Sequence, residues 1–345
     1  MQWTEVVGQP LAVRLLQRAV RTGKVAHAYL FAGPSGIGKR TIARLLAQVM
    51  LCQDPTPAGA PCGQCGPCRR TTAEPPMHPD LHMVEPDGRF IKTEQMKELQ
   101  SKLWSRPQEG RRAVAIIDGA DKLNPEAGNR LLKLLEEPPS YVILILLAEN
   151  LSGVLPTILS RCQVLNFAPL PLDEMAQPLA RLTGKSAAES RLLAALSGGS
   201  LGRALQLAQD EAVAARRSET YDLLLKLSEL DDLALVSQAE VLEKAKGDLE
   251  DWLEIMTVWL RDALLLAQMG AVTLILNADR QTEVAELVRR SGTDQLLRML
   301  TALGDFRAVH RRNVNLRLAL DVLLLRLAAA AKGAPELALN LPTPL

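Results

Sequence analysis

A glycine-rich segment carries the clearest chemical signal in the sequence. The run Gly33-Pro-Ser-Gly-Ile-Gly-Lys39 lies between an apolar, strand-like stretch at residues 28–32 and a helix-like stretch at residues 42–48. Such a loop points backbone N–H groups and a helix N-terminus at a polyphosphate, while its lysine reaches the terminal phosphates. The spacing therefore predicts a phosphate-binding loop, whose candidate nucleotide-binding residues are Gly33, Gly36, Gly38 and Lys39.

Two positions around this loop lack the side chains that hydrolysis needs. Arg40 stands where the pattern asks for Ser or Thr, whose hydroxyl ligates the Mg²⁺ that bridges the phosphates. Thr41 cannot replace that residue, because one residue turns a helix by about 100°. The apolar run 113–117 ends in Asp118, as a metal-binding strand does, but Gly119 follows and has no side chain to polarise water. We predict negligible hydrolysis, with either weak ATP or ADP binding or a loop kept only for folding.

Four of the five cysteines are crowded into a Pro- and Gly-rich stretch between residues 52 and 68. Four thiolates complete a tetrahedral Zn²⁺ shell, and a shell closed by protein ligands is structural rather than catalytic. The metal would hold this apolar-poor insertion against the helix that begins at the glycine loop. Unrelated free thiols and a redox-active pair are the alternatives. The predicted zinc ligands are Cys52, Cys62, Cys65 and Cys68.

Composition narrows the class of protein. The chain of 345 residues is 48% hydrophobic and 23% charged, as expected of a globular protein with two or three domains. A formal net charge of +1 gives no global electrostatic reason for binding nucleic acid. The sequence opens without a signal-like segment, and its longest apolar run, 142–148, is too short to span a bilayer. These features predict a cytoplasmic protein with no membrane partner.

Alternating strand-like and helix-like segments predict an open, mostly parallel α/β sheet over residues 1–167. The first helix, at residues 10–22, is amphipathic, with an apolar face made of Leu11, Leu15, Leu16 and Ala19. A later helix begins at Pro125 behind a capping asparagine and ends before two prolines. The remaining predicted elements are strands at 28–32, 80–85, 113–117 and 142–147 and a helix at 93–103.

After residue 167 the hydrophobic periodicity is only helical. Residues 168–208 are expected to form a small helical lid domain, and the leucine-rich residues 209–332 an all-helical domain. The last segment, 333–345, contains three prolines and is expected to be an unstructured tail. The predicted order is therefore an α/β domain with a zinc module at about 52–68, then the lid and the all-α domain.

Several of these motifs together resemble bacterial clamp-loader subunits of DNA polymerase III, which are AAA+ proteins. The resemblance covers essentially the whole chain. Its most specific part is the cysteine cluster inserted after the helix of the phosphate loop, followed by Leu-Glu-Glu-Pro-Pro and Ser-Arg-Cys. The matching stretches, besides the cysteines, are Glu5–Gln9, His27–Gly33, Leu131–Pro139, Thr157–Cys162, Gly198–Leu205 and Asn313–Leu327.

Within that family the chain is similar to the non-motor, delta-prime subunits. The gamma and tau motor subunits carry an intact Gly-Lys-Thr/Ser and an Asp-Glu pair, whereas this chain has Lys39-Arg40 and Asp118-Gly119. The resemblance implies a hetero-pentamer with gamma/tau and delta subunits that places the sliding clamp on primed DNA. It implies a cytoplasmic, replisome-associated part of a DNA-directed DNA polymerase holoenzyme, in which residues 209–332 form the oligomerisation collar.

The resemblance also assigns roles to single residues. Arg161 of Ser-Arg-Cys matches an arginine finger supplied in trans to ATP on a neighbouring subunit, and the alternative is an ordinary ion pair. Arg203 matches the sensor-2 arginine, which contacts a subunit's own nucleotide, or it makes only an ion pair between lid and core. The sensor-1 position aligns near Glu149 or Asn150, and a glutamate facing the γ-phosphate would repel it.

Two other functions compete with this one. A gamma-type subunit would bind and hydrolyse ATP by itself and lose that activity on Lys39→Ala. A zinc-dependent nucleic-acid binder unrelated to replication would show salt-sensitive DNA affinity in isolation.

Overall fold

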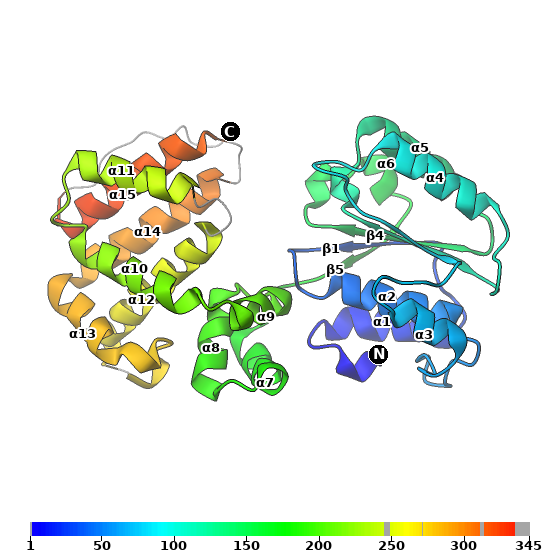
Figure 1. Ribbon diagram of the computed structural model, residues 1–345, viewed down its shortest axis with the longest axis horizontal. Helices are drawn as coiled ribbons and strands as arrows, with labels where there is room; N and C mark the ends of the chain where they lie inside the picture. The colour runs from blue at the N-terminus through cyan, green and yellow to red at the C-terminus, as the bar shows by residue number, and fades with distance from the viewer. Residues whose placement is uncertain (1, 245–248, 271, 311–313, 335–345) are drawn as a thin grey trace. The chain divides into compact units, whose positions relative to one another are not determined.

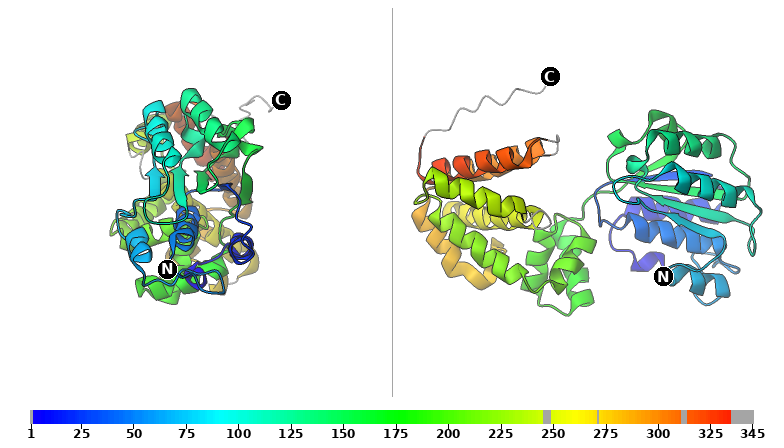
Figure 2. Two further views of the ribbon diagram at one scale, coloured as in Figure 1. Left: turned by 90° about the vertical axis from the view of Figure 1, so that its right-hand side faces the viewer. Right: turned by 45° about the horizontal axis from the view of Figure 1, so that its top comes forward.

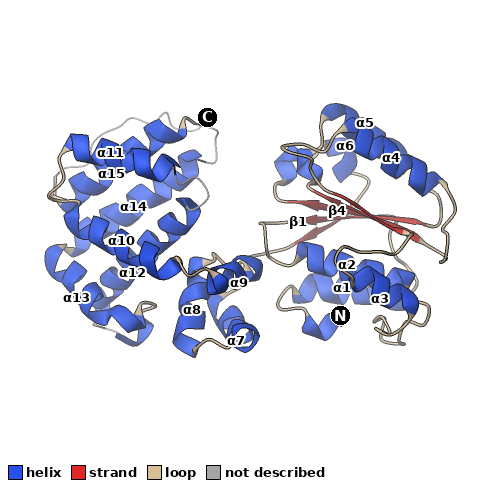
Figure 3. Cartoon of the chain, viewed as in Figure 1, coloured by secondary structure: helices blue, strands red, loops and turns tan. Residues whose placement is uncertain are grey.

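The computed structural model describes residues 2–244, 249–270, 272–310 and 314–334. The chain divides into two compact units, the first made of residues 1–178 with 199–202, and the second of 179–198 with 203–345. The strands of the described chain all lie in the first unit, and the second is helical (Figure 3). Most of the expected C-terminal tail, residues 335–345, lies outside the described residues.

The first unit is built on a parallel five-stranded sheet with the strand order β2-β3-β4-β1-β5. The side chains of β1 and β4 are buried throughout, as expected of strands covered on both faces. The four strands predicted from sequence are confirmed, whereas the edge strand β5 was not predicted. The strands are β1 (Ala28–Ala32), β2 (Leu81–Val84), β3 (Ala113–Asp118), β4 (Val142–Ala148) and β5 (Gln163–Asn166).

Helices cover both faces of this sheet (Figure 1), and the turned views show the same layers (Figure 2). Each face has its own apolar core, one packed under α1 and α2 and the other under α4 and α5. One face carries α1 (Pro10–Arg21), α2 (Lys39–Leu51) and α3 (Gly66–Thr72), and the other carries α4 (Thr93–Trp104), α5 (Pro125–Glu136) and α6 (Pro156–Leu159).

Local signals explain where these helices begin, but not always which face they bury. The Asn124 side chain accepts a hydrogen bond from the backbone N–H of Ala127 at 2.8 Å, which confirms the predicted cap of α5. The predicted apolar face of α1 is only partly correct, because Leu16 is buried whereas Leu11 and Leu15 are exposed. Together with Leu16 the helix buries Ala12, which was not predicted, against the sheet.

The strand order and the glycine loop after β1 make the first unit an AAA+ P-loop domain, as predicted. All described secondary structure after β5 is helical, and no described helix is long and apolar enough to cross a membrane.

The division between the two units passes through α7 and α9. The precise bounds of the lid and collar domains stay a prediction. The helices are α7 (Leu172–Thr183), α8 (Ala187–Leu196), α9 (Leu201–Gln209), α10 (Val213–Lys226), α11 (Asp232–Lys244), α12 (Leu249–Met269), α13 (Gln281–Arg290), α14 (Thr293–His310) and α15 (Leu316–Ala331).

Candidate functional site

The sheet brings the glycine loop and the predicted metal-binding acid to one edge. Strand β4 lies between β1 and β3, with Ala148 paired to Ala32 and Leu147 paired to Asp118. Because all three strands are parallel, the loop after β1, Asp118 and Glu149 leave the sheet at the same edge. The register of the strands therefore places the glycine loop and Asp118 next to each other, as the sequence predicted.

The first glycine of the loop is required by close packing. Gly33 has φ of 149°, and a Cβ added there would lie 2.3 Å from the carbonyl oxygen of Phe167. Its own N–H donates to the Ala148 carbonyl at 3.1 Å, which holds the start of the loop against β4. The loop then leads into α2, which begins at Lys39 with Gly38 as its N-cap.

The loop lysine is turned back onto the loop itself. Lys39 Nζ donates to the carbonyl oxygens of Gly33 at 2.5 Å and Pro34 at 2.6 Å, and the residue is only 7% exposed. Burial lowers the pKa of Lys39, while the nearby carboxylates of Glu149 and Asp118 act in the opposite direction. A phosphate would have to draw this ammonium group away from two carbonyl partners.

Arg40 fills the place of the missing hydroxyl with a positive charge. Its Nε donates to Asp118 Oδ2 at 2.7 Å, and its Nη2 forms an ion pair with Glu85, which directly follows β2. Thr41 is exposed, in agreement with the expectation that it does not replace the hydroxyl. Sequence reasoning missed Glu85, and its only signal was a position just after a strand that pairs with β3.

The structure also supplies no base beside the loop at residue 119. Gly119 has φ of 96°, a region that L side chains rarely adopt, and a Cβ there would lie 3.0 Å from Pro86. Glu149 lies 4.0 Å from the Lys122 ammonium group. The side-chain oxygen of Asn150 accepts hydrogen bonds from Ser152 and caps the short helix that follows, so this oxygen already has partners.

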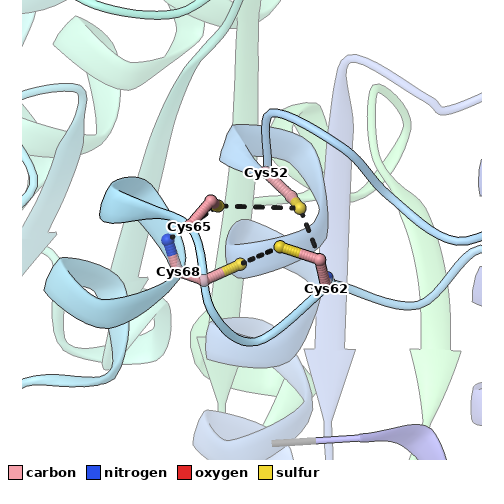
Figure 4. A group of neighbouring side chains, drawn as sticks. All are labelled: Cys52, Cys62, Cys65 and Cys68. Carbon is pink, nitrogen blue, oxygen red and sulfur yellow. Dashed lines mark hydrogen bonds between the residues drawn. The ribbon is translucent and has the colours of Figure 1, made fainter.

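The four predicted ligand cysteines come together in a compact cluster (Figure 4). Their sulfur atoms all lie within 4.8 Å of one another, with 4.0 Å between Cys52 and Cys65 and 3.9 Å between Cys62 and Cys68. Sulfurs bound to one tetrahedral zinc ion at about 2.3 Å are separated by about 3.8 Å. The cluster therefore fits a metal ion such as zinc.

Three chain segments position these thiols. Cys52 ends α2, Cys62 precedes a turn, and Cys65 and Cys68 form the first turn of α3. Backbone N–H groups point at two sulfurs, from Cys62 to Cys52 at 3.3 Å and from Cys68 to Cys65 at 3.5 Å. Side chains 53–58 between the first two ligands are all exposed, so the insertion has little core of its own.

The thiols differ in how readily they ionise without a metal. Backbone hydrogen bonds from Gln64 and Cys65 lower the pKa of Cys62 to about 6, whereas burial raises the pKa of Cys52 and of Cys68. A bound cation removes this difference, because a coordinating thiol is deprotonated. Burial raises the pKa of the remaining cysteine, Cys162, to about 12, as expected of a packed thiol.

The two arginines singled out by resemblance both have carboxylate partners. Arg161 Nη2 lies 2.9 Å from Glu136 Oε1, and its Nη1 donates to the Thr157 carbonyl at 3.0 Å. Arg203 Nη2 lies 2.5 Å from Asp251 Oδ1 within the helical unit. The finger role of Arg161 and the nucleotide role of Arg203 stay predictions.

Comparison with known proteins agrees with this geometry. Residues 8–171 match the family described as DNA polymerase III, delta subunit, and residues 212–329 match the family of its C-terminal part. The DNA polymerase III subunit delta-prime of Bacillus subtilis is 31% identical over 323 residues, which are 92% of this chain and 96% of that protein. The chain belongs to the DNA polymerase III delta-prime family.

Other relatives match over shorter lengths. The delta-prime subunit of Pseudomonas aeruginosa is 39% identical over 206 residues, or 59% of this chain and 61% of that protein. The tau subunit of Escherichia coli is 34% identical over 253 residues, or 71% of this chain but only 39% of that protein. The chain is thus similar both to delta-prime subunits and to a tau subunit.

We predict that the purified chain releases phosphate from ATP only at the background rate, and that Gly119→Glu does not change this. The left-handed backbone at residue 119 opposes a side chain, at a cost of about 1–3 kcal/mol in stability, and Arg40 still pairs with Asp118. Phosphate release and thermal unfolding measure the two effects. Hydrolysis by the wild-type chain that disappears on Lys39→Ala would contradict the prediction.

Removing the metal from the cysteine cluster should unfold the insertion locally. With EDTA, or in Cys65→Ser, we expect protease cleavage between residues 53 and 66 to become at least about tenfold faster, because the exposed segment loses its cross-link. Cys162→Ser is the matched control, since that thiol lies outside the cluster, and it should leave this cleavage rate unchanged. Equal cleavage with and without metal would rule out a structural ion.

Proposed function

We propose that this chain is the non-motor, delta-prime-type subunit of a bacterial DNA polymerase III clamp loader. It assembles with gamma/tau and delta subunits in a hetero-pentamer, and the assembly opens the sliding clamp and places it on primed DNA. Its own nucleotide site does not hydrolyse ATP, and its Arg161 completes the ATP site of a neighbouring motor subunit. It works in the cytoplasm at the replisome.

One contrast carries this proposal. The chain's own loop lacks the metal-binding hydroxyl and the base, and Lys39 and Arg40 are both engaged by groups of the same chain. Arg161 is, by comparison, 37% exposed at the protein surface, in an intact Ser-Arg-Cys motif. A protein built this way contributes to another subunit's chemistry rather than to its own. The same engaged loop argues against an independent gamma-type ATPase.

The contacts of Arg161 suit an arginine finger that exchanges its carboxylate partner for the γ-phosphate of a neighbouring subunit. Its ion pair with Glu136 joins two exposed side chains, and such pairs contribute only about 0–1 kcal/mol to stability. Contacts with the Thr157 carbonyl and the Ser160 hydroxyl hold Nη1. A γ-phosphate from a neighbour would therefore compete with one weak carboxylate contact, while the guanidinium keeps its anchoring to the chain.

The proposed metal is zinc with a structural role. Four cysteine sulfurs and no open position suit a closed tetrahedral shell rather than catalysis. The residues that would hold the ion are Cys52, Cys62, Cys65 and Cys68, and the ion would secure the insertion to the end of α2. Binding of ATP or ADP to the loop is proposed to be weak or absent, because Lys39 is already satisfied.

We predict that Arg161→Ala lowers ATP turnover at the neighbouring site of a reconstituted clamp loader by about 10³-fold, because arginine fingers contribute about that much to phosphoryl transfer. Arg161→Lys should lower ATP turnover nearly as much, since an ammonium group lacks the planar, bidentate hydrogen-bonding geometry of a guanidinium. The measurement is clamp- and DNA-stimulated ATPase of the complex with gamma/tau and delta, alongside native mass spectrometry to show that assembly is intact.

The control for this experiment is Arg106→Ala, which removes an exposed arginine outside the motif. It should leave both assembly and turnover unchanged. Normal turnover in an intact Arg161→Ala complex would mean that Arg161 serves only its ion pair with Glu136. Failure of the wild-type chain to enter the complex would overturn the proposed function itself.

A further inference from the structure

Arg40 bridges two carboxylates that the sheet places side by side. Strands β2 and β3 are paired in parallel with Val84 opposite Ile117, and the next residues along each strand are Glu85 and Asp118. Two acidic side chains at adjacent strand ends repel each other unless a cation lies between them. The Arg40 guanidinium supplies that cation, with Nε on Asp118 at 2.7 Å and Nη2 on Glu85.

Arg40 occupies the position at which a P-loop normally carries a ligand for Mg²⁺. Residue 40 follows the loop lysine, where a Ser or Thr would ligate Mg²⁺ together with the acid at the end of β3. That acid is present here as Asp118, but it pairs with the Arg40 guanidinium. Carboxylate and hydroxyl oxygens are the ligands that Mg²⁺ and Mn²⁺ prefer, and a guanidinium excludes such ions by its charge.

We propose that Arg40 takes the place of the divalent cation in this P-loop, so that Asp118 serves as an ion-pair partner rather than as a metal ligand. The wild-type chain then keeps the charge balance of a metal-loaded site without binding any metal there. Replacing Arg40 leaves Asp118 and Glu85 without their cation, and a divalent ion becomes their replacement. This inference concerns the chain's own loop and does not depend on the role of Arg161.

An ordinary surface ion pair is the competing interpretation. Arg40 is 46% exposed, Glu85 51% and Asp118 31%, so the direct effect of these contacts on stability is small. Stability alone therefore does not separate the two interpretations. Divalent-cation binding does, because a surface ion pair that is removed leaves no specific metal affinity.

The test is Mn²⁺ binding to the full-length chain, measured by electron paramagnetic resonance at constant ionic strength. Arg40→Thr should bind one Mn²⁺ at least about tenfold more tightly than the wild-type chain, because it combines the freed carboxylates with a hydroxyl ligand. Adding Asp118→Asn to that variant should abolish the gain. The melting temperature of Arg40→Thr should rise with added Mg²⁺ by about 2 °C or more, while that of the wild-type chain stays constant.

Arg44→Thr is the matched control. Arg44 lies one turn further along α2 and pairs with Glu74 instead. Arg44→Thr changes the net charge by the same amount as Arg40→Thr and should create no Mn²⁺ affinity. If Arg40→Thr does not fold, Arg40→Gln provides the same test with a longer neutral side chain. The proposal is overturned if these Arg40 variants bind Mn²⁺ no better than wild type, or if Arg44→Thr gains as much.

Discussion

The hydrogen-bonded register of five parallel strands is the constraint on which the first unit depends. Because β4 separates β1 from β3, the glycine loop and Asp118 reach the same edge with Glu149 between them. The neighbouring pair β2 and β3 adds Glu85 to that edge. A sheet edge with this many carboxylates needs positive charge, and Lys39 and Arg40 supply it from the start of α2.

The charges at this edge of the sheet are balanced by groups of the same chain, without a nucleotide or a metal ion. In a working P-loop the lysine and the metal ion are both completed by the phosphates. Here the lysine is completed by the carbonyls of Gly33 and Pro34, and the metal position by Arg40. A nucleotide would have to break contacts that the protein already makes. Arg161, by contrast, is held by one ion pair with Glu136 that joins two exposed side chains and contributes little to stability.

Local patterns were enough to predict most of the first unit. Continuous apolar runs located β1, β3 and β4, and a cap located α5, because those signals lie within the segments themselves. Strand β5 was missed because only one of its side chains, Leu165, is buried, and α3 because its ordering involves the cysteine cluster rather than apolar periodicity. The buried face of α1 was predicted correctly at Leu16 but not at Leu11 and Leu15, because that helix has apolar residues on most sides and tertiary packing decides which of them are buried. The sequence likewise showed that Arg40 removes a hydroxyl, but its pairing with Glu85 depends on three segments far apart in the chain.

The two departures from a working nucleotide site have different physical causes. At residue 119 the obstacle is steric, since the left-handed backbone and the nearby Pro86 ring disfavour any side chain. At residue 40 the obstacle is electrostatic, since a guanidinium neutralises the acids that would hold the metal. Reversing one leaves the other in force, because a base without a metal ion and a metal ion without a base both lack part of the phosphoryl-transfer machinery. A single substitution at residue 40 or at residue 119 would therefore not restore a complete phosphoryl-transfer site.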